Sequence, residues 1–122
     1  MGKHILLIDD QENLRSLLAQ ALRSNGYLVT TAVDGQAGLA LFNENKDKID
    51  LVLTDVNMPG IDGFQVLTQI KASNPKEPVI LLTGTNQEMA DYVGTELKAD
   101  GVLYKPYKVD EVLATIKKLL NQ

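Results

Sequence analysis

The sequence predicts an α/β fold in which one central parallel sheet carries helices on both faces. Four short apolar runs, residues 5–8, 51–53, 79–82 and 102–104, are nearly continuous instead of alternating. Continuous runs of this length are typical of parallel strands that are buried on both faces. Stretches with the apolar spacing of amphipathic helices separate the runs. This regular alternation predicts right-handed βαβ crossovers and a single sheet.

The composition is that of one folded domain. The chain has 122 residues, of which 44% are hydrophobic and 23% are charged, as in average globular domains of this size. We therefore predict a single domain over residues 1–122. The chain contains no cysteine, which excludes disulfides, thiolate metal sites and a cysteine nucleophile.

Charge and hydropathy exclude other classes of protein. The net charge is −4 and the chain has no tryptophan, so neither a basic field nor an aromatic platform for direct binding of nucleic acid is expected. The apolar run at residues 5–8 is too short for a signal peptide or a membrane span. We therefore expect a cytoplasmic domain that does not insert into membranes.

The first helix and the second strand follow the run at residues 5–8. One apolar stripe with helical spacing is formed by Leu14, Leu17, Leu18, Ala21 and Leu22. Gly26 supplies a signal for the C-terminal end of this helix. Residues 27–31 are more polar than the other runs and predict a strand at the edge of the sheet.

The remaining helices are predicted by caps and apolar spacing. Asp34 is a plausible N-cap for a helix that contains Ala37, Ala40 and Leu41, and the polar residues 43–50 predict a loop after it. A third helix after Asp62 contains Leu67 and Ile70. A fourth contains Met89, Ala90, Val93 and Leu97 and is weakened by Gly94. The fifth contains Val109, Val112, Leu113, Ile116 and Leu120.

Polar side chains follow four of the predicted strands where each strand ends. These residues are Asp9 and Asp10 after the first strand, Asp55 after the third, Thr83 after the fourth and Lys105 after the fifth. Ligands of open parallel sheets bind outside the carboxyl ends of the strands. We therefore expect three carboxylates, a hydroxyl and an ammonium group to meet at one edge of the sheet.

This set of groups is suited to phosphoryl chemistry. Clustered carboxylates repel one another unless a cation lies between them, and hard oxygen ligands suit Mg²⁺. Thr83 can donate to a phosphoryl oxygen, and Lys105 can neutralise another. A carboxylate such as Asp55 is a competent nucleophile that would form an aspartyl phosphate.

Each residue by itself has an ordinary structural interpretation. Asp9 or Asp10 could cap a helix, and Asp55 could begin a turn that continues through Asn57. Thr83 could be a turn residue and Lys105 a solvated surface lysine. The occurrence of all of them at the ends of four strands favours a common site.

These residues occur in motifs that resemble a known family. The motifs are Ile8-Asp9-Asp10, residues 55–63, residues 81–84 and Lys105-Pro106-Tyr107. Together they are similar to the receiver domain of bacterial two-component response regulators, the family of the chemotaxis regulators. The resemblance spans essentially the whole chain. It implies a flavodoxin-like, doubly wound (βα)5 sandwich with a five-stranded parallel sheet in the order 2-1-3-4-5.

The resemblance also implies roles for individual residues. Asp55 matches the phosphoacceptor, and Thr83 and Lys105 match the hydroxyl and the lysine that contact the phosphoryl group. The matching Mg²⁺ ligands are Asp10, Asp55, the backbone carbonyl of Asn57 and, through water, Asp9. The family's cis Lys-Pro bond predicts a cis Lys105-Pro106 peptide.

The implied activity is phosphorelay signalling. A sensor histidine kinase or a phosphotransfer protein would supply the phosphoryl group, and a downstream protein or domain would read the face formed by the fourth helix, fifth strand and fifth helix. The family usually carries an aromatic switch residue at the position of Val102, so Val102 departs from the pattern. Tyr104 and Tyr92 are candidate contact residues on that face. The domain would catalyse its own phosphorylation and dephosphorylation without being a turnover enzyme.

Two other functions are open. An Mg²⁺-dependent phosphatase with an aspartate nucleophile would turn over external phosphate esters, although such enzymes carry Asp-x-Asp after the first strand and this chain has Asp9-Asp10-Gln11. A receiver-like scaffold would bind partners without phosphorylation. The chain could be a stand-alone regulator or the receiver of a larger protein.

Overall fold

The computed structural model describes residues 2–84 and 99–122, and within them it confirms the predicted α/β fold. The sheet consists of β1 (His4–Ile8), β2 (Leu28–Ala32), β3 (Leu51–Asp55), β4 (Val79–Thr83) and β5 (Gly101–Tyr104), and the helices are α1 (Glu12–Ser24), α2 (Gly35–Glu44), α3 (Gly63–Ser73) and α5 (Val109–Leu119). All strand pairs are parallel, in the expected order β2-β1-β3-β4-β5. The predicted fourth helix and Tyr92 lie outside the described residues.

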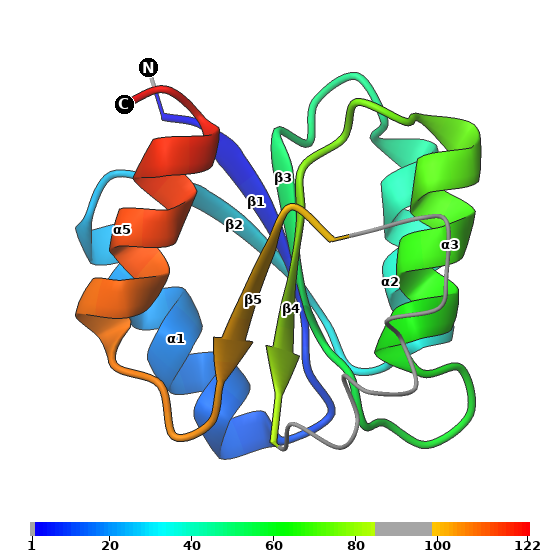
Figure 1. The fold of residues 1–122 in the computed structure, drawn as a ribbon, viewed down its shortest axis with the longest axis horizontal. Coiled ribbons are helices and arrows are strands. Elements are labelled where there is room, and N and C mark those ends of the chain that lie inside the picture. The colour runs from blue at the N-terminus through cyan, green and yellow to red at the C-terminus, as the bar shows by residue number, and fades with distance from the viewer. Residues whose placement is uncertain (1, 85–98) are drawn as a thin grey trace.

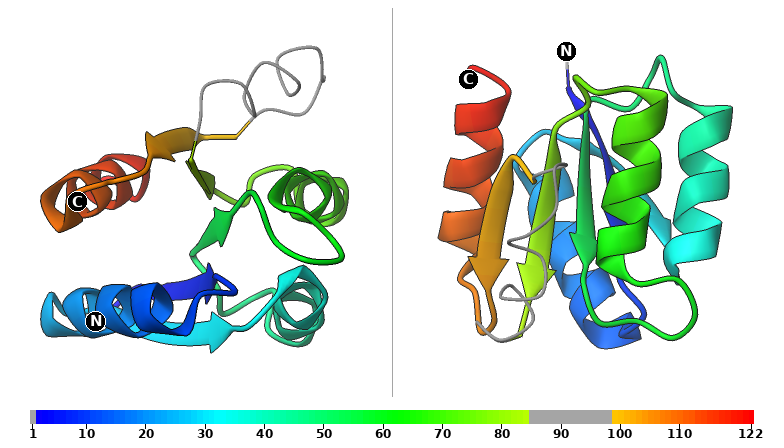
Figure 2. Two further views of the ribbon diagram at one scale, coloured as in Figure 1. Left: turned by 90° about the horizontal axis from the view of Figure 1, so that it is seen from below. Right: turned by 45° about the vertical axis from the view of Figure 1, so that its right-hand side comes forward.

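The sheet separates two hydrophobic layers. Figures 1 and 2 show α1 and α5 on one face of the sheet and α2 and α3 on the other. Along β1, Ile5 and Leu7 pack with α1 and α5, whereas Leu6 and Ile8 pack with α2 and α3. All four of these side chains are fully buried. The continuous apolar runs thus result from strands that have a helix layer on each side.

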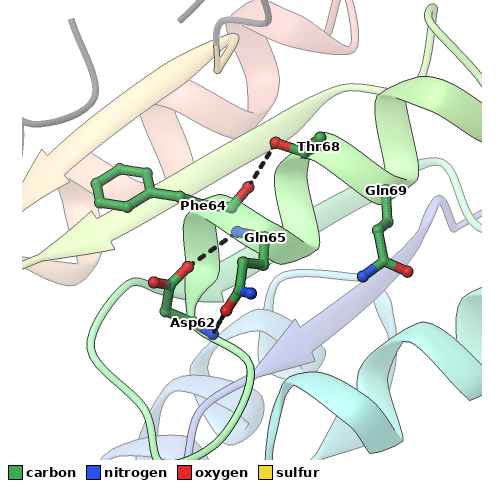
Figure 3. Close-up of a pocket in the computed structure, with 5 residues that line it drawn as sticks. All are labelled: Asp62, Phe64, Gln65, Thr68 and Gln69. Carbon is green, nitrogen blue, oxygen red and sulfur yellow. Dashed lines mark hydrogen bonds between the residues drawn. The ribbon is translucent and has the colours of Figure 1, made fainter.

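The helix ends follow from local sequence. The Asp34 carboxylate accepts a hydrogen bond from the backbone N–H of Ala37, so Asp34 is the predicted N-cap of α2. At α3, Asp62 and Gln65 exchange side chain–backbone hydrogen bonds of 2.9 and 3.0 Å, which forms a capping box (Figure 3). Gly26 follows α1 with a φ of +90°, a conformation that favours glycine.

Three local predictions were inaccurate. Leu17 belongs to the predicted apolar stripe of α1, but it is 65% exposed. Leu18 and Leu22 of the stripe are buried as predicted, and the third buried residue of α1 is Ala19, which the stripe did not include. The helix α2 extends to Glu44 and shortens the predicted 43–50 loop, and β2 begins at Leu28, one residue later than expected.

Among the described residues, no helix is both long enough and apolar enough to span a membrane.

Candidate functional site

The strand register brings the predicted site residues to one edge of the sheet. Ile8 pairs with Thr54, so Asp9 and Asp55 are the next residues along β1 and β3. Thr83 closes β4 and pairs with Tyr104, the residue before Lys105. This edge is at the lower end of the sheet in Figure 1, where the arrowheads of β4 and β5 lie. The predicted convergence at the carboxyl ends of the strands is therefore present.

Three carboxylates form the acidic part of the site. Asp9, Asp10 and Asp55 each offer an oxygen within 4.8 Å of the others. Asp9 and Asp55 are buried, whereas Asp10 is exposed. The Asp9 Oδ1 accepts a 2.9 Å hydrogen bond from the backbone N–H of Gln11, but its buried Oδ2 has no hydrogen-bond partner among the described residues. A buried carboxylate with an unpaired oxygen, grouped with two other carboxylates, fits the ligand set of a hard divalent cation.

The capping interpretation of these aspartates does not hold. The N-cap of α1 is Gln11, and its side chain makes no capping hydrogen bond. The Asp10 carboxylate and the Oδ2 of Asp9 are thus available to the cluster.

A lysine completes the site. The Lys105 Nζ donates to the Oδ2 of Asp55 at 2.9 Å, and the Oδ1 of Asp55 accepts from the backbone N–H of Val56 at 3.0 Å. Thr83 is 1% exposed. The Lys105-Pro106 peptide is cis, as expected.

Burial raises the pKa of two carboxyl groups at the site. Desolvation is the main cause of the raised pKa of Asp55; the hydrogen bond and charge of Lys105 offset it only in part, and Asp9 and Asp10 add repulsion. Burial likewise raises the pKa of Asp9. Tyr107 is the third affected group, since burial and the charges of Asp9 and Asp55 raise its pKa to about 12. The site is therefore short of positive charge without a metal ion.

This shortage predicts the effect of removing one charge. In EDTA at pH 8, Asp55→Asn is expected to melt several degrees above the wild type, because ionised Asp55 is less favourable in the folded than in the unfolded chain. The difference should disappear at acidic pH, where Asp55 is protonated in both states. Circular dichroism melts at both pH values provide the measurement, with the exposed Asp110→Asn as control. An unchanged or lower midpoint at pH 8 contradicts the expectation.

Other predicted residues lie near this edge. Asn57 is exposed and lies two residues beyond the end of β3; its carbonyl as a metal ligand stays a prediction. Val102 is partly buried and packs with the α2–α3 layer, whereas Leu103 belongs to the α1–α5 layer. Tyr104 is 46% exposed and is available as a contact residue.

Two neighbours of the site were missed from the sequence. The Arg15 Nη1 donates to the backbone carbonyl of Asp9 at 2.8 Å. Tyr107 lies close enough to Asp9 and Asp55 for their charges to raise its pKa. Arg15 carried no signal of its own, since an arginine on a helix is ordinarily a solvated residue. Tyr107 belonged to a recognised motif but had no assigned role.

Comparisons with known proteins agree with this geometry. The family model of the response regulator receiver domain matches residues 5–117. The alkaline phosphatase synthesis transcriptional regulatory protein PhoP of Bacillus subtilis is 37% identical over 122 residues, which cover all of this chain and 50% of PhoP. The chain thus spans about half the length of the curated relatives that it matches.

Solved structures show the same fold. A receiver domain protein of Clostridium thermocellum is 32% identical, with a TM-score of 0.91 and coverage of 98% of this chain and 94% of that one. The response regulator TrrA of Thermotoga maritima, in complex with Mg²⁺-BeF, is 35% identical, with a TM-score of 0.87 and coverage of 96% and 98%. The family match, the sheet order and the acidic edge with its lysine together show that the chain belongs to the response regulator receiver domain family.

Proposed function

We propose that Asp55 accepts a phosphoryl group from a phosphohistidine in a phosphorelay and that this step requires Mg²⁺. The observation that carries the proposal is the contact of Lys105 Nζ with Asp55 Oδ2 beside two further carboxylates. A nucleophile, a fixed cation and an oxygen-rich cation site at one sheet edge are the parts that phosphoryl transfer needs. The similarity to TrrA, which was solved with Mg²⁺-BeF, supports the same use of this edge.

The chemistry follows from the positions of the groups. A carboxylate oxygen of Asp55 attacks phosphorus, the phosphorus–nitrogen bond of the phosphohistidine breaks, and the imidazole leaves and takes up a proton. Bound Mg²⁺ would supply the positive charge that the cluster lacks. Lys105 neutralises a phosphoryl oxygen, and Thr83 offers its hydroxyl to another. Water later hydrolyses the acyl phosphate, so the domain limits the lifetime of its own signal. In this proposal the domain acts on no other substrate.

The donor protein must reach Asp55 from outside the sheet edge. Beside Lys105 lies a hollow that is lined by Leu14, Lys105, Pro106 and Tyr107, and the adjoining Leu17 and Val109 are 65% and 39% exposed. Exposed apolar side chains next to a site are typical of protein contacts. We propose that the sensor kinase or phosphotransfer protein docks on this surface.

The output is proposed to use a different surface. Tyr104 is exposed on β5, and Thr83 is its register partner on β4. Movement of Thr83 toward a phosphoryl group would therefore change the surface next to Tyr104. A partner protein or domain would read this place together with α5, without the aromatic switch that Val102 replaces. The predicted fourth helix, which would complete this surface, falls on residues outside those that the structure describes.

Phosphorylation by acetyl phosphate tests the proposal. Intact-mass spectrometry is expected to show one added phosphoryl group in Mg²⁺ and none in EDTA or in Asp55→Asn, because the variant lacks the nucleophile. Asp110→Asn, an exposed carboxylate on α5, is the matched control and should be labelled normally.

Three results decide against the proposal. Undiminished phosphorylation of Asp55→Asn would show that another residue is the phosphoacceptor. Steady turnover of a generic phosphate ester by the wild type would favour the phosphatase alternative, and no label under any condition would favour the scaffold.

A further inference from the structure

The turn between β1 and α1 is held by an arginine from the helix that follows it. The Arg15 Nη1 donates to the carbonyl oxygen of Asp9 at 2.8 Å. That carbonyl belongs to the peptide that links Asp9 to Asp10, so the bond fixes the plane of the peptide that leads into Asp10. In the described part of the chain, the exposed Asp10 side chain makes no hydrogen bond of its own.

Asp9 is held at three further points. Its backbone N–H donates to the carbonyl of Ala32 at 3.2 Å, its Oδ1 accepts from the N–H of Gln11, and its side chain is fully buried. The position of Asp9 therefore has support besides Arg15. The direction in which the chain leaves Asp9 toward Asp10 is supported by Arg15.

We propose that Arg15 is a positioning residue for the divalent cation: it orients the Asp9–Asp10 peptide so that both carboxylates face Asp55. The inference rests on the proposed function in taking Mg²⁺ as the cation. Residues that orient metal ligands typically change metal affinity by about 10- to 100-fold when they are replaced.

Charge and geometry predict opposite results at this position. Arg15 is close enough for its charge to act on Asp9, and a nearby positive charge opposes the binding of a cation. If Arg15 acted only through its charge, its removal would strengthen Mg²⁺ binding. If it positions the ligands, its removal weakens binding despite the gain in electrostatic attraction. The sign of the change therefore separates the two roles.

The same helix provides a matched control. The Arg23 Nη2 donates to the backbone carbonyl of Val29 at 2.9 Å, near the opposite end of α1. Arg23→Met removes the same charge and the same kind of hydrogen bond as Arg15→Met. It does so away from the acidic cluster.

The test is an Mg²⁺ titration followed by amide chemical shifts. We expect the Kd of Arg15→Met for Mg²⁺ to rise about tenfold. Arg15→Lys should recover part of the lost affinity, because lysine keeps a hydrogen-bond donor and the positive charge. The Kd of Arg23→Met should stay within about twofold of the wild-type value. Without metal, the amide shift of Asp10 should change in Arg15→Met but not in Arg23→Met. Thermal midpoints show whether each variant is folded.

A kinetic arm separates this inference from the proposed function. With acetyl phosphate, Arg15→Met should need more Mg²⁺ for half-maximal phosphorylation of Asp55 while its rate at saturating Mg²⁺ stays near that of the wild type. An unchanged or lower Kd in Arg15→Met, with a wild type that is phosphorylated normally, overturns the positioning role alone. A wild type that neither binds Mg²⁺ nor accepts a phosphoryl group overturns both proposals.

Discussion

Lys71→Met is expected to lower the free energy of unfolding by about 3 kcal/mol, the lower end of the range for breaking a buried ion pair. Lys71 is 7% exposed, and its Nζ donates at 2.7 Å both to Asp100 Oδ2 and to the carbonyl of Glu77. The Asp100 side chain is 35% exposed, so water can partly replace the lost ammonium group. This solvation keeps the loss from reaching the upper end of the range.

The cost arises because Lys71 joins three parts of the chain. Asp100 Oδ2 also accepts a 2.9 Å hydrogen bond from the backbone N–H of Val79. One ammonium group on α3 therefore supports the first residue of β4 and the residue before β5. Without it, the Asp100 carboxylate and the Glu77 carbonyl lose their shared donor.

Urea unfolding in EDTA measures the effect. Lys76→Met is the control, because Lys76 is exposed in the loop after α3 and its replacement should change the free energy of unfolding by no more than about 0.5 kcal/mol. If Lys71→Met costs as little as Lys76→Met, the ion pair with Asp100 does not stabilise the fold.

Much of the fold and of the Asp55 site could be predicted because local sequence determines it. The strands β1, β3, β4 and β5 each contain a short apolar run, and the polar residue that ends such a run must lie at the carboxyl edge of a parallel sheet. The adjacency of Asp9 and Asp55 requires in addition that β1 lies beside β3, a strand order that was implied by the family resemblance and not by the local sequence.

The cluster around Lys71 could not be predicted in this way. Its members come from α3, the following loop and the residue before β5, and each resembles an ordinary surface charge in the sequence. Only tertiary packing shows that Lys71 and Glu77 are 7% and 3% exposed. Leu17 illustrates the converse, since its apolar spacing predicts burial but the neighbouring elements leave it exposed.

Glu77 makes the stability of the protein depend on pH. Burial, with repulsion from Asp50 and Asp100 and partial compensation by Lys71, raises the pKa of Glu77 from 4.5 to about 7. Between these values the folded protein keeps a proton that the unfolded chain has released. The contribution of Glu77 to the free energy of unfolding therefore falls by roughly 3 kcal/mol as the pH rises from about 4.5 to about 7. Above that range this contribution no longer changes with pH.

Glu77→Gln is expected to remove this pH dependence. Glutamine has nearly the same size and carries no charge, so the difference in free energy of unfolding between variant and wild type should grow by roughly 3 kcal/mol between pH 4 and pH 8. Urea unfolding in EDTA across this range gives the difference, and Glu44→Gln, an exposed carboxylate on α2, controls for the loss of a negative charge.

The slope of this difference, and not its absolute value, is the decisive quantity. Within the described part of the chain, the Oε2 of Glu77 is buried without a hydrogen-bond partner, so the side-chain amide of the Glu77→Gln variant would bring a buried donor that also lacks one, at a cost independent of pH. Lys71→Met should extend the wild-type slope to higher pH, because Lys71 lowers the pKa of Glu77. A difference between Glu77→Gln and the wild type that is flat from pH 4 to pH 8 would show that folding does not raise the pKa of Glu77.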